Sequence, residues 1–335
     1  MPVSSSLSLK PLTPQPENMS QITSPTPKPG DADFLGIDWG TTHRRGYRFA
    51  GPEASVRVRA DADGALACKG RFAAALVALE QQLDCAPSRV VMAGMVGSAL
   101  GWETVPYVDA SVRLQSLPQH LHRLADSSPG HTLQVVPGYC VRDAHGRPDV
   151  MRGEETQLLG AVMAGHANGW FVLPGTHSKW VFLEEGYIRQ LRTYMTGEIF
   201  DLLRKQGTIA SAIGGAAIDT AARSNWDAQA FVDGVAAAAQ GALAHLLFGV
   251  RARVVCGDLA PASATAYLSG LLIGHELHDV VGNGAGVDRF CIIGSPALAT
   301  LYTDAAQSSG LACEALDAEQ LFIAAMQHFR LETYP

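Results

Sequence analysis

The chain has 335 residues, of which 47% are hydrophobic and 17% charged, and its formal net charge is −7. This length normally gives two domains with a sizeable core, and this composition excludes a largely disordered protein. The acidic balance argues against binding to nucleic acid or to anionic membranes, because both require a basic face. No apolar run is long enough to span a bilayer, and the N-terminus lacks the features of a signal peptide.

The six cysteines form no CxxC pair, and their spacing fits no zinc motif. They indicate reduced thiols in a cytoplasmic protein. The cysteines are Cys68, Cys85, Cys140, Cys256, Cys291 and Cys313.

Residues 1–30 are rich in Ser, Pro and Thr. Such a segment buries too little apolar surface to offset the entropy of ordering, so we expect a flexible tail. Ordered structure is predicted to begin at Phe34.

Three successive strands open the first half. The predicted elements are strands at 34–39, 44–49 and 55–60, a helix at 71–83, buried strands at 90–93 and 133–137, and a helix that begins at Gly153.

The second half repeats this plan. The predicted elements are strands at 170–173, 179–183 and 187–195, a mostly helical region from 200 to about 247, a helix from about Ser263, a strand at 289–293 and a helix after it. Asp317 is expected to cap a last helix from Ala318 to about Arg330.

This repeated order predicts an α/β fold built from two duplicated ribonuclease-H-like lobes, each with a mixed sheet flanked by helices. We expect the lobes at 31–165 and 166–335, with the last helix as a candidate to pack back toward the first lobe. A cleft between two such lobes is a natural active site.

A strand, a Gly-Thr turn and a second strand occur twice, in FLGIDWGTTHRRGYRF from Phe34 and in WFVLPGTHSKWVFL from Trp170. A tight turn of this kind presents backbone N–H groups and a hydroxyl, which can bind an anion. Either copy alone is also typical of an ordinary β-hairpin. Its repetition in the two halves predicts two lobes that grip one polyphosphate.

The first loop combines Asp38, Gly40, Thr41 and Thr42. An aspartate at a strand end beside a phosphate site is suited to hold Mg²⁺ through water, although it is also a common turn residue. Gly40 lets the backbone approach a ligand closely, and the two threonines can donate their hydroxyls to phosphate oxygens.

The second loop combines Gly175, Thr176 and Lys179. The lysine is suited to bind phosphate as a point charge, or it is a solvated residue at a strand end. The loop contains no acidic residue, so any metal must be held by the other half.

Glu154 and Glu155 fall in the first turn of the helix that begins at Gly153. Acidic residues stabilise a helix at this position, and that role alone accounts for their presence. Phosphoryl transfer also requires a base for the nucleophilic hydroxyl, so one of these carboxylates is a candidate general base.

The sequence IIGSPA predicts a strand-to-helix turn in which Ser295 is the N-cap and Pro296 the first helical residue. Gly294 leaves room for a flat ring such as adenine. An ordinary connection between a strand and a helix explains the same sequence.

With these motifs, the chain resembles the 2-dehydro-3-deoxygalactonokinases, a branch of the actin, sugar-kinase and heat-shock ATPase superfamily. The matching stretches are IDWGTT at Ile37, VMAGMVGS at Val91, GW at Gly101, PY at Pro106, MRGEETQLLGA at Met151, PGTHSKWV at Pro174, MTGE at Met195 and SGLLIG at Ser269. The chain departs from the family in its long N-terminal tail and in its second loop, which lacks an acidic residue.

The resemblance implies phosphorylation of the 6-hydroxyl group of 2-dehydro-3-deoxy-D-galactonate, with ATP and Mg²⁺, in galactonate catabolism. It places Asp38, as a catalytic and metal-binding residue, in the first phosphate loop. It places Gly294 and Ser295 in the adenosine loop. It places Glu154 where the heat-shock members of the superfamily have their catalytic glutamate.

The substrate implied by the resemblance is an acid sugar, whose carboxylate suits the planar fork of an arginine. The candidates are Arg45, Arg152 and Arg192, each of which is equally explained by a surface ion pair. Candidates to line the sugar pocket are Ser98, Trp102 and Tyr107.

Two alternatives stay open. One is a kinase for a different 2-keto-3-deoxy sugar acid, since a few hydrogen bonds decide which epimer is bound. The other is an ATP-gated interaction protein of the actin or heat-shock kind. The sequence also leaves open whether the chain forms a homo-oligomer.

Overall fold

The computed structural model describes residues 33–50, 55–213, 226–282 and 286–332. The predicted tail at 1–30 and part of the predicted helical region after residue 200 lie outside these ranges. Among the helices of the described ranges, none is both long and apolar enough to cross a membrane.

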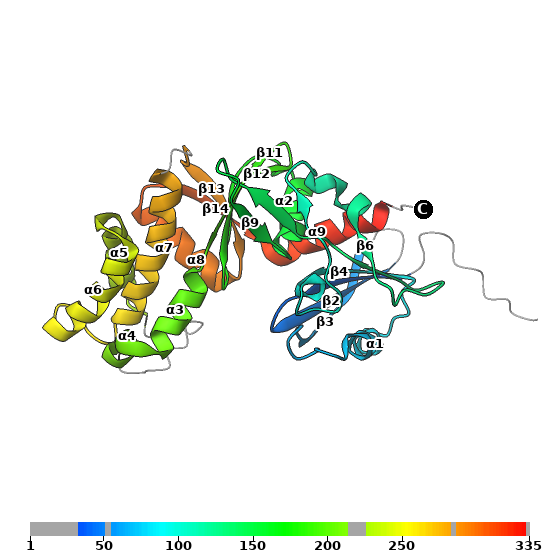
Figure 1. Cartoon of the computed structure of the whole chain (residues 1–335), viewed down its shortest axis with the longest axis horizontal. Coiled ribbons are helices and arrows are strands. Elements are labelled where there is room, and N and C mark those ends of the chain that lie inside the picture. Colours follow the sequence, from blue (N-terminus) through cyan, green and yellow to red (C-terminus); the bar gives the residue numbers. More distant parts are fainter. Residues whose placement is uncertain (1–32, 51–54, 214–225, 283–285, 333–335) are drawn as a thin grey trace, which may run out of the picture.

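The first sheet has six strands in the order β3-β2-β1-β4-β7-β6 (Figure 1). β1, β2 and β3 form an antiparallel meander, β4 and β7 extend it in parallel with β1, and β6 closes it antiparallel to β7. The strands are β1 (Phe34–Trp39), β2 (His43–Ala50), β3 (Ser55–Asp63), β4 (Arg89–Gly94), β6 (His122–Arg123) and β7 (Thr132–Val135). Helix α1 (Phe72–Gln82) packs on its outer face through Phe72, Leu76 and Leu79.

The second sheet has the order β12-β11-β10-β13-β14. It again begins with an antiparallel meander, and β13 and β14 extend it in parallel with β10. The strands are β10 (Gly169–Leu173), β11 (Ser178–Glu184), β12 (Tyr187–Tyr194), β13 (Arg289–Gly294) and β14 (Ala312–Asp317). The first five strands of the first sheet have this same arrangement, so the predicted fold class of duplicated mixed sheets is confirmed.

Several strands were not predicted from the sequence. β14 has the sequence ACEALD, which contains no β-branched residue and therefore gives little strand signal. A small third sheet, in the order β5-β8-β9, lies beside the main ones. Its strands are β5 (Val108–Asp109), β8 (Tyr139–Arg142) and β9 (Pro148–Met151).

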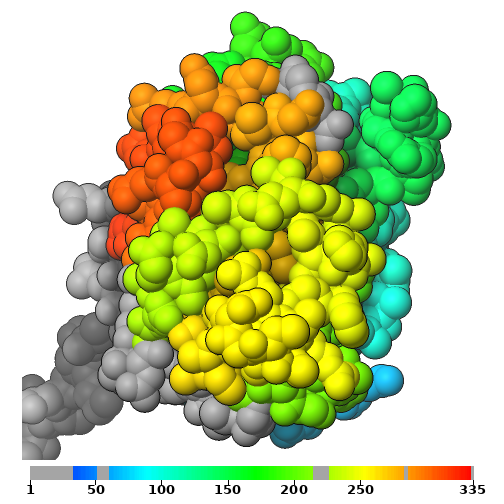
Figure 2. Space-filling view, turned by 90° about the vertical axis from the view of Figure 1, so that its left-hand side faces the viewer, coloured from blue at the N-terminus to red at the C-terminus, as the bar shows by residue number. Residues whose placement is uncertain are grey.

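Helices cover the outer face of the second sheet (Figure 1). Their apolar sides enclose Trp180, Phe231 and Phe290 in one core. Figure 2 shows α6, in yellow, on the surface of this helical layer. The helices are α3 (Thr196–Lys205), α4 (Gly207–Ile213), α5 (Ala228–Ala237), α6 (Leu243–Cys256), α7 (Ala264–Gly282) and α8 (Pro296–Ser308). Short 3-10 turns occur at Met95–Gly97, Leu114–His120 and Ala238–Gln240.

Helices α2 (Glu154–Met163) and α9 (Ala318–Leu331) pack against each other and against both sheets. α9 follows the second sheet in the chain but extends over the first (Figure 1). There the ring centre of Phe322 lies 5.4 Å from that of Tyr47. As predicted, Asp317 is the N-cap of α9, and its Oδ1 accepts hydrogen bonds from the backbone N–H groups of Glu319 and Gln320. These two helices therefore join the sheets through one shared core.

Candidate active site

A cleft of about 750 Å³ lies where the ends of both sheets meet. Ten of the residues predicted as site residues line it together. They are Asp38, Gly40, Thr41, Arg45, Arg152, Glu154, Gly175, Thr176, Gly294 and Ser295. Among the described residues, the remaining candidates are not part of this lining: Thr42, Ser98, Trp102, Tyr107, Glu155, Lys179 and Arg192.

The topology explains why residues so distant in the sequence meet here. β1 is parallel to β4, and β10 is parallel to β13, so the carboxyl ends of these central strands lie at one edge of each sheet. Loops that leave the carboxyl ends of parallel strands are the usual ligand-binding edge of α/β sheets. In this chain the two edges face the same cleft.

The first loop is fixed by a backbone segment behind it. The N–H groups of Gly64, Ala65 and Leu66 donate to the carbonyls of Thr42, Gly40 and Thr41 at 2.9, 2.9 and 3.1 Å respectively. All three carbonyls of the loop are thereby occupied, and its conformation is set before any ligand binds.

Asp38 lies at the end of β1, directly opposite Arg45 of β2. One oxygen of the Asp38 carboxylate is 3.5 Å from Nη1 of Arg45, whose Nε lies 3.6 Å from Asp61. Burial raises the pKa of Asp38, and the positive charge of Arg45 opposes this shift. The cleft therefore holds a carboxylate whose charge is only partly compensated by the protein.

The second loop is held by the first turn of α3. The carbonyl of Thr176 accepts a hydrogen bond from the N–H of Glu198 at 2.9 Å. Nε2 of His177 lies 2.6 Å from the Glu198 carboxylate. His177 lines the cleft beside the loop, although sequence reasoning gave it no role.

Lys179 lies outside the cleft, in β11, with only 7% of its surface exposed. Its Nζ donates to the carbonyl of Val150 at 2.8 Å and to Oγ1 of Thr193 at 2.9 Å. The ammonium group thus links β11 to β9 and β12, and a direct contact with phosphate would require these bonds to break. The positive charge of Lys179 still acts on the cleft, because it lowers the pKa of Glu154.

Glu154 faces the cleft from the first turn of α2. The preceding Gly153 has a φ of +110°, and a Cβ there would lie 3.3 Å from the Cα of Gly94, so the turn is built for glycine. Oε2 of Glu154 accepts a hydrogen bond from the N–H of Arg152 at 3.1 Å. Burial raises the pKa of Glu154, the Lys179 charge opposes this, and Asp38 adds to it.

Glu155 points away from the cleft into the core and is 0% exposed. Its carboxyl group accepts a hydrogen bond from the N–H of Gly153 at 2.6 Å and one from Oγ1 of Thr156 at 3.2 Å. Burial, together with the nearby charge of Glu154, raises the pKa of Glu155 to about 8. The structure thus separates two neighbouring acids that the sequence left equivalent.

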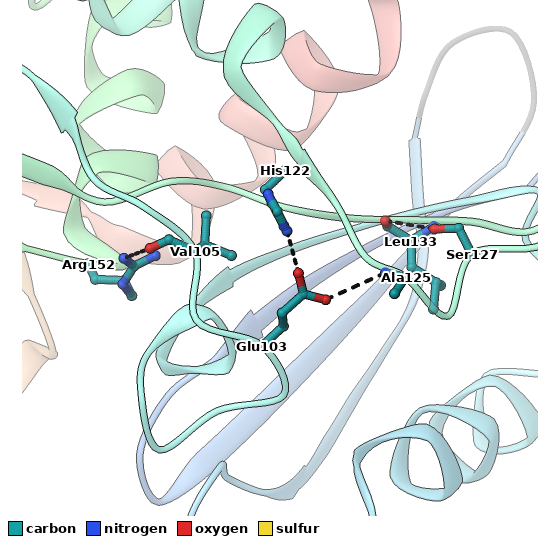
Figure 3. Close-up of polar contacts among 7 residues, drawn as sticks. All are labelled: Glu103, Val105, His122, Ala125, Ser127, Leu133 and Arg152. Atoms are coloured by element: carbon teal, nitrogen blue, oxygen red, sulfur yellow. Dashed lines mark hydrogen bonds and ion pairs between the residues drawn. The ribbon is translucent and has the colours of Figure 1, made fainter.

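Arg152 combines an anchor with unused hydrogen-bonding capacity. Its Nη2 donates to the carbonyl of Val105 at 2.6 Å, as Figure 3 shows, and its guanidinium carbon lies 4.4 Å from the centre of the Tyr107 ring. Within the described part of the chain, its buried Nε and Nη1 have no hydrogen-bond partner. A buried cation with unpaired donors at a cleft is suited to bind an anion.

Two of the candidates for the sugar pocket have packing partners elsewhere. Trp102 stacks on Phe72 and donates its indole N–H to Asp126 at 2.9 Å. Oγ of Ser98 donates to the carbonyl of Met95 at 2.8 Å, which closes a turn.

Arg192 lies in a second cavity, of about 880 Å³, between the β8–β9 hairpin and β12. Its Nη1 is 3.8 Å from Asp279. The three arginine candidates therefore differ in position, since Arg45 and Arg152 line the cleft and Arg192 does not.

The turn after β13 forms the wall of the cleft next to the second loop. Ser295 caps α8 as predicted, with its Oγ accepting from the N–H of Leu298 at 3.4 Å, and Pro296 is the first helical residue. A Cβ on Gly294 would lie 3.2 Å from Pro174, so this wall is closely packed.

Duplicated mixed sheets with glycine-rich loops facing one cleft define a two-lobed α/β protein of the ribonuclease-H-like class. The sequence model of the 2-keto-3-deoxy-galactonokinase family matches residues 38–329. The chain therefore belongs to this family, whose name is a synonym of the one inferred from the motifs, so that inference is confirmed.

Individual relatives agree with the family match. A Rhizobium meliloti protein assigned as a 2-dehydro-3-deoxygalactonokinase is 36% identical over 293 residues, which cover 86% of this chain and 93% of the relative. The 2-dehydro-3-deoxygalactonokinase of Escherichia coli is 34% identical over 301 residues, covering 88% and 97%. A crystal structure of a Sinorhizobium meliloti protein with the same assignment superposes with a TM-score of 0.78 at 32% identity, covering 90% and 97%.

Proposed function

We propose that the protein is an ATP-dependent kinase that transfers a phosphoryl group to the 6-hydroxyl of 2-dehydro-3-deoxy-D-galactonate, in the cytoplasmic catabolism of galactonate. The family match and the names of its relatives support this substrate. The observation that carries the proposal is that both glycine loops and Glu154 line one cleft.

In this proposal the nucleotide lies across the two lobes. The loops at Gly40 and Gly175 flank its phosphates, because backbone N–H groups in tight turns bind anions. The turn at Gly294 and Ser295 takes the adenosine, next to the first turn of α8. All these residues line the same cavity, whose volume is in the range typical of small-molecule sites.

Asp38 is the residue proposed to hold Mg²⁺, because its carboxylate offers the hard oxygen ligands that this ion prefers. Asp38 and Glu154 line the same cleft, and the charge of Asp38 adds to the raised pKa of Glu154. The ion, when bound, would neutralise charge on the phosphates. Of the two glycine loops, only the first carries an acidic side chain, and we assign the metal to that loop.

Glu154 is proposed as the general base that accepts the proton of the substrate 6-hydroxyl as its oxygen attacks the terminal phosphorus. Burial raises the pKa of this carboxyl group, which strengthens it as a base, and the Lys179 charge opposes the shift and helps to keep the group ionised. Glu155 is enclosed in the core and has no path to the substrate.

Arg152 is proposed to bind the substrate carboxylate through one of its unpaired donors, Nε or Nη1. The Nε–H lies on the Nη2 side of the guanidinium and Nη1 on the other, so each of these groups offers a single charge-assisted hydrogen bond to a carboxylate oxygen. The bond from Nη2 to Val105 and the contact with Tyr107 fix the orientation of the guanidinium. Arg45 is the weaker candidate, because its guanidinium already lies between Asp38 and Asp61.

The test is a coupled ADP-release assay over a panel of 2-keto-3-deoxy sugar acids, with ³¹P NMR to locate the phosphate on the product. We expect the galacto epimer to give the highest kcat/KM and phosphate on O6. A higher kcat/KM for another epimer would reassign the substrate. ATP hydrolysis that no sugar acid accelerates would favour the ATP-gated interaction protein instead.

A further inference from the structure

A cluster of three side chains that commonly bind metals lies between the end of α2 and the second sheet, and none of the three is part of the cleft lining. We propose that His166, Cys291 and Glu314 form a binding site for a divalent cation of borderline softness, for which Zn²⁺ is the best-suited ion. One ligand atom from each residue lies within 4.8 Å of the other two. We call these three residues the distal cluster.

The sheet itself brings two of the three together. β13 and β14 are parallel, and their register pairs Cys291 with Glu314, so both side chains project from the same face. His166 follows the end of α2 and is fixed by a backbone hydrogen bond of 2.9 Å to the carbonyl of Ala161. Three separate elements thus direct one ligand each to a common point.

The distal cluster is separate from the proposed kinase site. On the same face of each strand, the nearest residues that line the cleft are Ile293 and Leu316, two residues beyond Cys291 and Glu314. Two residues of a strand span about 7 Å. Among the described residues, the cleft lining includes no member of the cluster.

The donor set matches zinc chemistry. Thiolate, imidazole and carboxylate are its three protein ligand types, and ideal bond lengths place two ligands of a tetrahedral ion about 3.5 Å apart. The three ligand atoms lie within 4.8 Å of one another. Side-chain movements of about 1 Å would bring them to the tetrahedral spacing, and a water molecule would be the fourth ligand. All three residues are partly exposed, so an ion can enter from solvent.

A second-sphere partner is also present. Nη2 of Arg289 lies 3.0 Å from Oε2 of Glu314, which leaves the other carboxylate oxygen for a metal. Such an outer hydrogen bond orients a ligating carboxylate.

Binding would be linked to one proton. Burial, and then the charge of Glu314, raise the pKa of the Cys291 thiol, while Arg289 opposes this and the neighbouring Cys313 adds to it. The thiol is therefore protonated in the metal-free protein and would release its proton to solvent as the sulfur–metal bond forms.

The bound ion would connect the C-terminal end of α2 to two strands of the second sheet. The first turn of the same helix carries Glu154 at the cleft. Because binding favours only the folded state, we expect a stabilising ion. We expect no direct part for it in the chemistry.

The experiment is a titration of the chelator-treated full-length protein with Co²⁺, a coloured substitute for Zn²⁺, followed by its thiolate-to-metal charge-transfer absorption. Cys291→Ser should abolish this band, and His166→Ala should weaken binding at least tenfold. The matched control is Cys313→Ser, since Cys313 pairs with Phe290 and lies on the opposite face of the sheet. This control should keep the band and one equivalent of bound Co²⁺.

A thermal measurement gives a second, independent test. Zn²⁺ should raise the Tm of the wild type and of Cys313→Ser but not that of Cys291→Ser, whose metal-free Tm should match the wild type. The proposal is overturned if the wild type shows no one-to-one thiolate band, or if Cys291→Ser retains it. The rate of ADP release by these variants decides neither the Co²⁺ titration nor the thermal measurement.

Discussion

Gly160 of α2 lies directly against the backbone carbonyl of Leu321 of α9, so that a Cβ on Gly160 would come 1.8 Å from that oxygen. This contact is possible only because glycine has no side chain. It lets α2 and α9 cross at close range between the two sheets, within the core that both sheets share. The position of Glu154, six residues earlier on α2, therefore depends on it.

Gly160→Ala should lower the free energy of unfolding by about 1–3 kcal/mol, because the added methyl group forces the helices apart. Urea denaturation measures this change. The matched control is Gly249→Ala in α6, where a Cβ would have no heavy atom within 4 Å. The control should gain about 0.5–1 kcal/mol from helix propensity, and equal losses in both variants would contradict the packing argument.

Glu155→Gln should change how stability depends on pH. The folded-state pKa of Glu155 is about 8, above its value of 4.5 in the unfolded chain, so the folded state binds the extra proton between these values. Stability from this group is fully present below about pH 4.5 and is lost as the pH rises through 8. Urea denaturation at pH 5 and pH 8 should show a smaller fall for Glu155→Gln than for the wild type.

Glu276 of α7 has a buried carboxyl group that accepts hydrogen bonds from Ser178, Trp180 and Tyr302, each at 2.9 Å. Glu276→Ala removes the acceptor that these three donors share and should destabilise the protein by about 3–5 kcal/mol. Because Ser178 follows the second glycine loop, KM for ATP should also rise. Thermal unfolding and ATP titrations check both effects, and an unchanged Tm would show that the network contributes little.

Arg152→Lys keeps the positive charge but loses the planar fork. We expect KM for the sugar acid to rise about 10- to 100-fold, with KM for ATP nearly unchanged, in steady-state assays. Arg192→Lys is the control, because Arg192 is paired with Asp279 in the other cavity. If Arg192→Lys raises KM instead, the substrate carboxylate binds in that cavity.

The repeated meander made most of the fold predictable from the sequence. Its strands alternate with turns marked by Gly40 and Gly175, and the two halves share one order of elements, so these two patterns together indicated a duplication. The caps at Ser295 and Asp317 were equally predictable, because capping depends on local side chains. β14 was missed, since its sequence lacks the β-branched residues that mark a strand.

The site was predictable in its loops but less so in its side chains. Glu154 and Glu155 are neighbours in sequence, and only their packing shows that one faces the cleft and the other the core. The bonds of Lys179 to Val150 and Thr193 depend on distant strands and leave no local signal. The distal cluster escaped motif reasoning for the same reason, because Cys291 meets His166 only through the fold.

The most direct test of the proposed mechanism is the kcat of Glu154→Gln in the ADP-release assay, measured together with its ATP affinity by calorimetry. In Glu154→Gln the side chain keeps its size but cannot accept the proton. The control, Glu155→Gln, replaces a carboxyl group that is largely protonated at neutral pH. We predict that Glu154→Gln binds ATP like the wild type and loses at least about 100-fold in kcat, while Glu155→Gln retains most of its activity. A Glu154→Gln enzyme with wild-type kcat would contradict the account.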